Sequence, residues 1–262
     1  MKTKLKGILF DLDETLIDWT HFAQDWREHE VRHLSHVYAF LERKGSPPNV
    51  PLPQLAEVFG KRVMEAWSQA RATLRAPHLG KILVEVLSDH NVRFNGNGIT
   101  GITMEACLEA YQWGALPNVT AFPEVPQVLE TLIANGIRIG IVTNAFQPMT
   151  LRDVELEQYG LLQYFTHAPA RITAADAGYL KPHPHIFQHA LKAMEYGADE
   201  VVFVGDNAVA DVAGAQGVGM KAVLRRRATS PRLISGVIVP DAIIDDLNGL
   251  LAVLDGWYEG WR

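Results

Sequence analysis

Two aspartates, Asp11 and Asp13, directly follow the short apolar run of residues 8–10 near the start of the chain. Such a run is typical of a strand that is buried on both faces of a parallel sheet. Because a turn begins where the strand ends, both carboxylates could reach one pocket. Burying two like charges together costs free energy unless a cation or a shared proton compensates for them. The pair therefore indicates a site built around charge.

Two further apolar runs, residues 137–142 and 201–204, also end in polar residues. In open parallel sheets, ligands bind beyond the carboxyl ends of the strands. We therefore expect the polar residues that follow these runs, or lie close to them in the chain, to converge there. In chain order they are Thr143, Asn144, Lys181, Asp206, Asn207 and Asp211.

This combination of side chains suits a phosphoryl group. Asp11, Asp206 and a backbone carbonyl offer the hard oxygen ligands that Mg²⁺ prefers. Lys181 and the metal can neutralise charge on the phosphoryl oxygens, while Thr143 and nearby N–H groups position them. A carboxylate beside the cation can then attack phosphorus and form an aspartyl-phosphate.

Strand and helix patterns alternate over residues 1–18 and 120–262, which predicts an α/β fold with a doubly wound parallel sheet and right-handed crossovers. The expected strands cover residues 8–10, 137–142, 201–204, 220–224 and 242–244. The expected helices cover residues 125–135, 149–159, 184–195, 209–216 and 247–254.

Residues 19–119 have a different character and predict an all-helical unit inserted into the α/β core. Apolar residues recur at helical spacing, and glycines and prolines separate the segments. We expect helices over residues 19–44, 54–74, 78–90 and 103–114, a turn at 95–98, and flexible linkers near 17–19 and 119–122.

The composition is that of an ordinary globular protein: 262 residues, 48% hydrophobic, 21% charged and with a net charge of -6. An acidic chain argues against a nucleic-acid or anionic-membrane partner. The one basic cluster, Arg225 to Arg227 with Arg232, is expected in a solvated loop. Cys107 is the only cysteine of the sequence, so an intrachain disulfide is excluded, and its side chain is expected to be buried. Without a signal peptide or an apolar run of membrane-spanning length, we expect a cytoplasmic protein.

Four short motifs resemble those of the haloacid dehalogenase-like superfamily, in the same order along the chain. They are Asp11-Leu12-Asp13-Glu14-Thr15, Thr143, Lys181, and Gly205-Asp206-Asn207 with Asp211. The resemblance implies a Rossmann-like catalytic core over residues 1–18 and 120–262. It also implies that residues 19–119 form a helical cap of the C1 type and that the protein is a Mg²⁺-dependent phosphatase acting on a small phosphorylated metabolite.

The resemblance also implies catalytic roles. Asp11 would be the nucleophile and a Mg²⁺ ligand. Asp13 would protonate the leaving oxygen and then activate water, while its backbone carbonyl binds the metal. Thr143 would donate a hydrogen bond to the phosphoryl oxygens, and Lys181 would hold the nucleophile and the phosphate in place.

Four more residues receive supporting roles from the same resemblance. Asp206 would bind Mg²⁺, and Asp211 would support the lysine and the metal-bound water. Asn144 and Asn207 would contact the phosphate or hold the groups that do. Oligomeric state and the identity of the metabolite stay open, with phosphoglycolate, sugar phosphates, phosphoserine and nucleotide monophosphates among the candidates.

Alternatives to hydrolysis of a phosphate ester make different demands on these residues. True haloacid dehalogenases lack an aspartate at the place of Asp13, because halide leaves without a proton, whereas an alkoxide needs one. A phosphotransferase of the phosphoglucomutase kind would pass the phosphoryl group to a second hydroxyl. Phosphonate cleavage would need a cap lysine, and Lys44, Lys61 and Lys81 have no recognisable setting for it. A non-catalytic module would be expected to lose at least one residue of the catalytic set.

The first predicted cap helix carries polar and aromatic residues that could serve other purposes. His29, His33 and His36 have spacings that could face a metal, but an exposed polar face is the preferred interpretation. Trp19 and Trp26 enter the cap just after the Asp11–Asp13 turn. Tryptophans at helical spacing are more often packing residues than pocket walls, so packing is the expectation for both.

Overall fold

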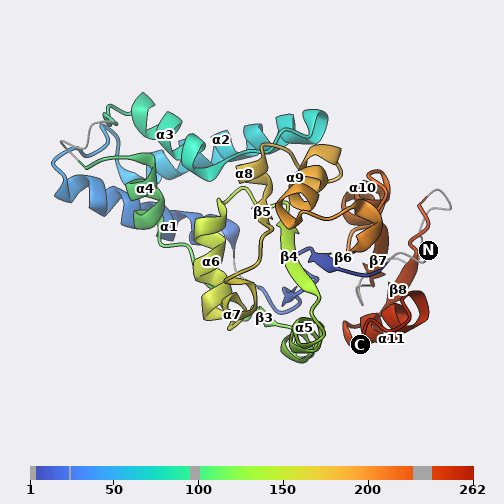
Figure 1. The fold of residues 1–262 in the computed structure, drawn as a ribbon. Helices are drawn as coiled ribbons and strands as arrows, with labels where there is room; N and C mark the ends of the chain where they lie inside the picture. Colours follow the sequence, from blue (N-terminus) through green and yellow to red (C-terminus); the bar gives the residue numbers. More distant parts are fainter. Residues whose placement is uncertain (1–3, 24, 95–100, 227–237) are drawn as a thin grey trace.

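A computed structural model describes residues 4–23, 25–94, 101–226 and 238–262 of the chain. Figure 1 shows a sheet with helices on both of its faces and a block of helices to one side. The six strands pair in parallel in the order β5-β4-β1-β6-β7-β8. Their bounds are β1 Gly7–Phe10, β4 Arg138–Thr143, β5 Arg171–Thr173, β6 Val201–Gly205, β7 Lys221–Arg225 and β8 Ala242–Ile244. The predicted doubly wound parallel sheet is confirmed, and β5 is an additional strand.

Alternate residues of β1 pack against different helices, as the two-residue period of a strand requires. Ile8 and Phe10 belong to a cluster with α5 (Val125–Ala134), α6 (Met149–Gln158), α7 (Leu162–Phe165) and α11 (Asn248–Trp257). Leu9 belongs to a second cluster with α9 (Pro184–Met194), the π-helix η2 (Ala208–Ala213) and α10 (Gly214–Gln216). The short elements α8 (Ala174–Ala177) and η1 (Ala198–Glu200) complete this part. The central strand is therefore buried on both faces.

Four helices make up the block beside the sheet: α1 (Trp26–Arg43), α2 (Leu52–Thr73), α3 (Leu79–Asp89) and α4 (Met104–Tyr111). They share a hydrophobic cluster of their own that includes Leu34, Phe59 and the buried Cys107. The first helix begins at Trp26 and not at Trp19 as predicted, because the Asp25 side chain accepts a hydrogen bond from the backbone N–H of Arg27 and caps it. The turn predicted at 95–98 lies outside the described residues.

The helical block meets the α/β part of the chain through a small two-stranded sheet. Its strands, β2 (Ile17–Asp18) and β3 (Thr120–Ala121), pair in antiparallel orientation. These strands lie in the two segments that were expected to be flexible linkers. They were missed because two residues are too few to show the alternating pattern of a strand in the sequence. Further backbone hydrogen bonds join the block to loops of the main sheet, from Leu79 N to Phe146 O and from Ala76 N to Gly178 O.

Arg225, the first residue of the basic cluster, does not lie in a solvated loop as its composition suggested. Arg225 ends β7 and is 4% exposed. Its guanidinium lies 2.7 Å from the Glu124 carboxylate and over the ring of Phe122. The partner carboxylate is remote in sequence, so composition alone gave the wrong prediction here. Arg226 is exposed, whereas Arg227 and Arg232 lie outside the described residues. Among the helices that the structure describes, none has the length and apolar character needed to cross a bilayer.

Candidate active site

The strand order brings the predicted site residues to one edge of the sheet. β1 lies between β4 and β6, with Phe10 opposite Ile141 on one side and Val204 on the other. The three strands run in the same direction, so their carboxyl ends deliver Asp11, Thr143 and Asp206 to the same place. The strands that follow β1 in the chain are added first on one side of it and then on the other, which makes this edge a topological switch point. Open α/β sheets bind ligands at such points.

Lys181 occupies the centre of the site and is almost completely buried. Its Nζ lies 2.6 Å from Asp11 Oδ1 and 2.7 Å from Asp211 Oδ1. Burial by itself lowers the pKa of the lysine, but the two carboxylates outweigh this effect and raise the pKa above its ordinary value. Lys181 therefore carries a fixed positive charge beside Asp11.

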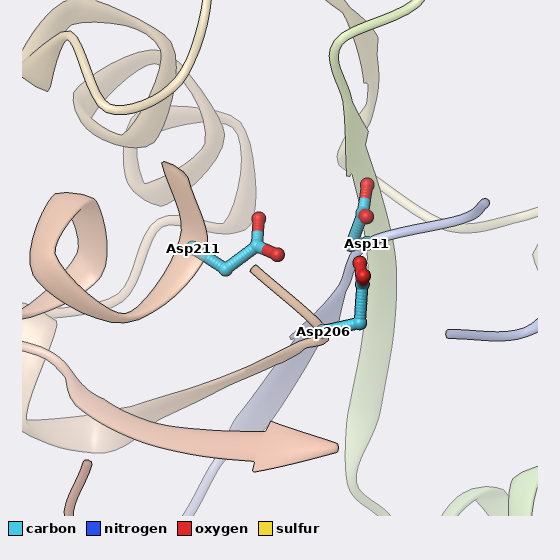
Figure 2. A group of neighbouring side chains, drawn as sticks. All are labelled: Asp11, Asp206 and Asp211. Carbon is cyan, nitrogen blue, oxygen red and sulfur yellow. The ribbon is translucent and has the colours of Figure 1, made fainter. Parts of the chain in front are cut away.

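Asp11, Asp206 and Asp211 form an acidic cluster in which one oxygen of each carboxylate lies within 4.8 Å of the others. Figure 2 shows the three side chains grouped around a common space. Burial raises the pKa of Asp11 well above its usual range; Lys181 opposes this, and the neighbouring aspartates add to it. The cluster thus holds more negative charge than the lysine compensates. An all-oxygen donor set with excess negative charge fits a Mg²⁺ ion.

Asp13 faces the same cavity and is held by three side chains. Trp19 Nε1 donates a hydrogen bond to Asp13 Oδ1 at 3.1 Å, and Arg152 Nη2 lies 2.7 Å from the same oxygen. Thr143 Oγ1 lies 3.5 Å from Asp13 Oδ2. The second aspartate of the motif is therefore oriented separately from the first, and of these two it is Asp11 whose carboxylate forms the ion pair with Lys181.

Arg152 is a site residue that sequence reasoning missed. It belongs to α6, and its Nη1 also lies 3.0 Å from Glu155 Oε2, which accepts a hydrogen bond from Trp113 Nε1. The side chains of Arg152 and Glu155 are 3% and 0% exposed. Burial raises the pKa of Glu155 to about 7, although Arg152 opposes the shift. An Arg–Glu pair three residues apart in a helix usually lies on the surface, so the sequence gave no sign of this role.

The two asparagines predicted at the site support its loops. Asn144 accepts a hydrogen bond from the backbone N–H of Lys181 at 2.7 Å and donates one to the Lys181 carbonyl at 3.2 Å. Asn207 caps η2 by accepting from Val209 N and Ala210 N. The Asn207 N–H in turn donates to Asp211 Oδ2. Direct contacts of these asparagines with a phosphate stay a prediction.

A cavity of about 310 Å³ lies over these residues. All of the predicted site residues line it, together with Arg152 and residues 145–147. Four tryptophans also line it and make up a tryptophan wall: Trp19, Trp26, Trp67 and Trp113. Trp19 and Trp26 do pack, with ring centroids 6.0 Å apart, but they also line the pocket. The expectation of packing alone was therefore incomplete.

Two of the three histidines of α1 do not lie on the exposed polar face that was expected, and the third, His36, is half-buried. His29 and His33 are 5% and 6% exposed, and their Nε2 atoms lie 2.8 Å apart. His33 Nδ1 lies 2.7 Å from the backbone carbonyl of Tyr111, to which it must donate. Burial lowers the pKa of His33 to about 4. The two histidines are buried because α4 packs against this side of α1. The spacing of residues along α1 does not show which of its sides another helix covers.

Comparison with known proteins places the chain in a family. Residues 5–219 match the family model of haloacid dehalogenase-like hydrolases. The chain belongs to this family. The resemblance drawn from the four motifs is thereby confirmed, and with it the class of fold.

Individual relatives extend the comparison over most of the chain. A glyceraldehyde 3-phosphate phosphatase of Pyrococcus abyssi is 28% identical over 225 residues, covering 84% of this chain and 80% of that protein. A haloacid dehalogenase-like phosphatase of Thermococcus onnurineus superposes with a TM-score of 0.57 at 24% identity, over 97% and 99% of the two chains. A 2-haloacid dehalogenase of Pseudomonas syringae pv. Tomato DC3000 gives a TM-score of 0.56 at 27% identity, over 97% and 99%.

Proposed function

We propose that the protein is a Mg²⁺-dependent phosphatase that hydrolyses a small phosphorylated metabolite through an aspartyl-phosphate. The observation that carries the proposal is the pairing of two differently held carboxylates at one strand end. Asp11 is buried beside Lys181, and Asp13 is held apart by Arg152 and Trp19. Family membership and named phosphatases that align over most of the chain support the phosphatase activity.

In the first step, an oxygen of Asp11 attacks phosphorus, and the bond from phosphorus to the substrate oxygen breaks. Asp13 gives its proton to that oxygen, which leaves as an alcohol. Lys181 stabilises the charge on the phosphoryl oxygens, and Thr143 donates a hydrogen bond to them. A bound Mg²⁺, held by Asp11, the Asp13 carbonyl and Asp206, would supply further positive charge.

In the second step, Asp13 has become a carboxylate and accepts a proton from water. The water oxygen attacks phosphorus, the bond between Asp11 and phosphorus breaks, and inorganic phosphate is released. Arg152 keeps the Asp13 carboxylate within the cavity through both steps. Asp211 supports this cycle by its ion pair with Lys181.

We assign residues 1–18 and 120–262 to the catalytic core and residues 19–119 to a cap of the C1 type. The four tryptophans that line the cavity all belong to residues 19–119. Closure of the cap would bring these apolar side chains over the reacting groups and exclude water from them. A phosphotransferase uses the same first step and differs only in the acceptor of the phosphoryl group.

The test is release of inorganic phosphate from p-nitrophenyl phosphate with Mg²⁺. Wild type should be active, and Asp11→Asn should lose activity by about 10³-fold or more, since the amide is not a nucleophile. Equal activity in the variant would refute the nucleophile. No activity in wild type with any common divalent metal would support the non-catalytic alternative. Phosphate that appears on an added alcohol and not in solution would indicate a phosphotransferase.

A further inference from the structure

A second cavity continues from the proposed active site into the helical block. It has a volume of about 970 Å³ and lies mainly between α1 and α2. Both cavities are lined by the same five residues at their junction: Trp26, Trp67, Trp113, Phe146 and Gln147. A substrate whose phosphate contacts Lys181 would therefore extend into this space. Its volume is at the upper end of ligand pockets, which run from about 300 to 1,000 Å³, and it exceeds the needs of a three-carbon phosphate.

The wall of the second cavity is unusually apolar for an exposed surface. Trp26 is 47% exposed, Met64 67% and Val31 39%, and all three line this cavity. Large exposed apolar side chains that gather in one hollow indicate a binding site. Because the second cavity shares lining residues with the cavity over Lys181, the organic part of a bound substrate would occupy it.

Charges around the second cavity balance one another. Among its described lining residues, Arg27 and Lys61 are cationic, whereas Glu30 and Glu57 are anionic. A site for a second phosphate or a carboxylate would be expected to show an excess of cations. The balance favours a substrate body that carries no charge of its own.

Four of the five residues at the junction have flat aromatic side chains. Trp67 meets Phe146 edge to face, with centroids 6.1 Å apart, and Trp26 also lines both cavities. Aromatic faces gain most from contact with another flat ring. We propose that the natural substrate is a phosphomonoester whose alcohol carries an uncharged, flat ring that stacks on Trp26 and Trp67. This inference rests on the proposed phosphatase function.

The test compares benzyl phosphate with glycerol phosphate, both of which leave as primary alcohols and make the same demand on Asp13. Wild type should favour benzyl phosphate by about tenfold or more in kcat/KM. Trp26→Leu and Trp67→Leu keep the wall apolar but remove the flat surface. Each should lower the ratio of kcat/KM for benzyl phosphate to kcat/KM for glycerol phosphate by about three- to tenfold, mainly through a higher KM for benzyl phosphate.

Trp257→Leu, in α11 outside both cavities, is the matched control and should change neither substrate. Cyclohexylmethyl phosphate separates a flat ring from mere apolar bulk. The inference would be overturned if Asp11-dependent hydrolysis showed no preference for benzyl phosphate, or if cyclohexylmethyl phosphate were preferred equally. The proposed phosphatase function would stand in both cases. Absence of Asp11-dependent hydrolysis for every ester would instead overturn the proposed function.

Discussion

At the scale of single residues, the site separates two carboxylates that lie two positions apart in the chain. Asp11 contacts Lys181 in a buried setting, whereas Asp13 contacts Arg152 and Trp19. Sequence motifs predicted both aspartates and the lysine. They did not predict Arg152. Its role depends on where α6 lies against the strand ends and on the carboxylate of Asp13, which is 139 residues away in the chain.

The proton-transfer role proposed for Asp13 predicts a dependence on the leaving group. Asp13→Asn should lower kcat for glycerol phosphate by about 10²- to 10⁴-fold, because its alkoxide needs a proton. Formation of the aspartyl-phosphate from p-nitrophenyl phosphate should fall much less, since nitrophenolate leaves unprotonated. Burst-phase release of nitrophenol measures this step. An equal loss of the first step for both esters would assign Asp13 a purely structural role.

The buried Arg152–Glu155 pair predicts a large and non-additive effect on stability. Arg152→Met leaves Glu155 buried without its ion pair and should lower the free energy of unfolding by about 3–5 kcal/mol. The double variant Arg152→Met/Glu155→Met should recover much of that loss while remaining poorly active, because Asp13 is no longer held. Urea unfolding and initial rates measure the two effects. A double variant with full activity would exclude the positioning role of Arg152.

At the scale of secondary-structure elements, the longer helices were predicted from the spacing of their apolar residues and from Gly and Pro at their ends. The strands that carry the site were also predicted, because each is an apolar run that ends in polar residues. Three short strands were not predicted: β2, β3 and β5 have two or three residues, and their partners are remote in sequence. The three-residue strand β8 was predicted from its apolar residues. The burial of His29 and His33 between α1 and α4 was missed for the same reason.

The contact between α1 and α4 predicts a loss of stability in acid. Burial lowers the pKa of His33 from its ordinary value to about 4 in the folded protein. The folded state therefore binds fewer protons, and the stabilisation present above pH 6.5 is lost as the pH falls toward 4. At pH 5 the loss amounts to about 2 kcal/mol relative to pH 7.5. His33→Gln should flatten this slope in urea unfolding; an unchanged slope would assign it to other groups.

At the scale of the whole molecule, an α/β part supplies the charges and a helical block supplies the aromatic wall. Family motifs predicted the first, since strand ends converge by topology. The second was beyond the sequence, because the tryptophans that line the cavity come from separate segments: the one after β2, helices α1 and α2, and the one after α4. Only their arrangement in space distinguishes a wall from ordinary packing.

The acidic cluster predicts that Mg²⁺ stabilises the folded protein. At a concentration 100 times its Kd, Mg²⁺ should add about 2.7 kcal/mol to the free energy of unfolding and raise Tm. Asp206→Asn should remove this increment, whereas Asp255→Asn, an exposed carboxylate paired with Arg262, should retain it. A Tm that does not respond to Mg²⁺ in wild type would contradict the assignment of the cluster as a metal site.

The central claim is that Asp11 becomes phosphorylated. Asp13→Asn with p-nitrophenyl phosphate and Mg²⁺ should accumulate the intermediate, because the leaving group needs no proton but the attacking water needs a base. Borohydride reduction of the acid-quenched protein converts an aspartyl-phosphate to homoserine, which peptide mass spectrometry locates. We predict homoserine at position 11 and none in Asp11→Asn/Asp13→Asn. Homoserine at another position, or its absence at position 11 while nitrophenol is released, would contradict the account.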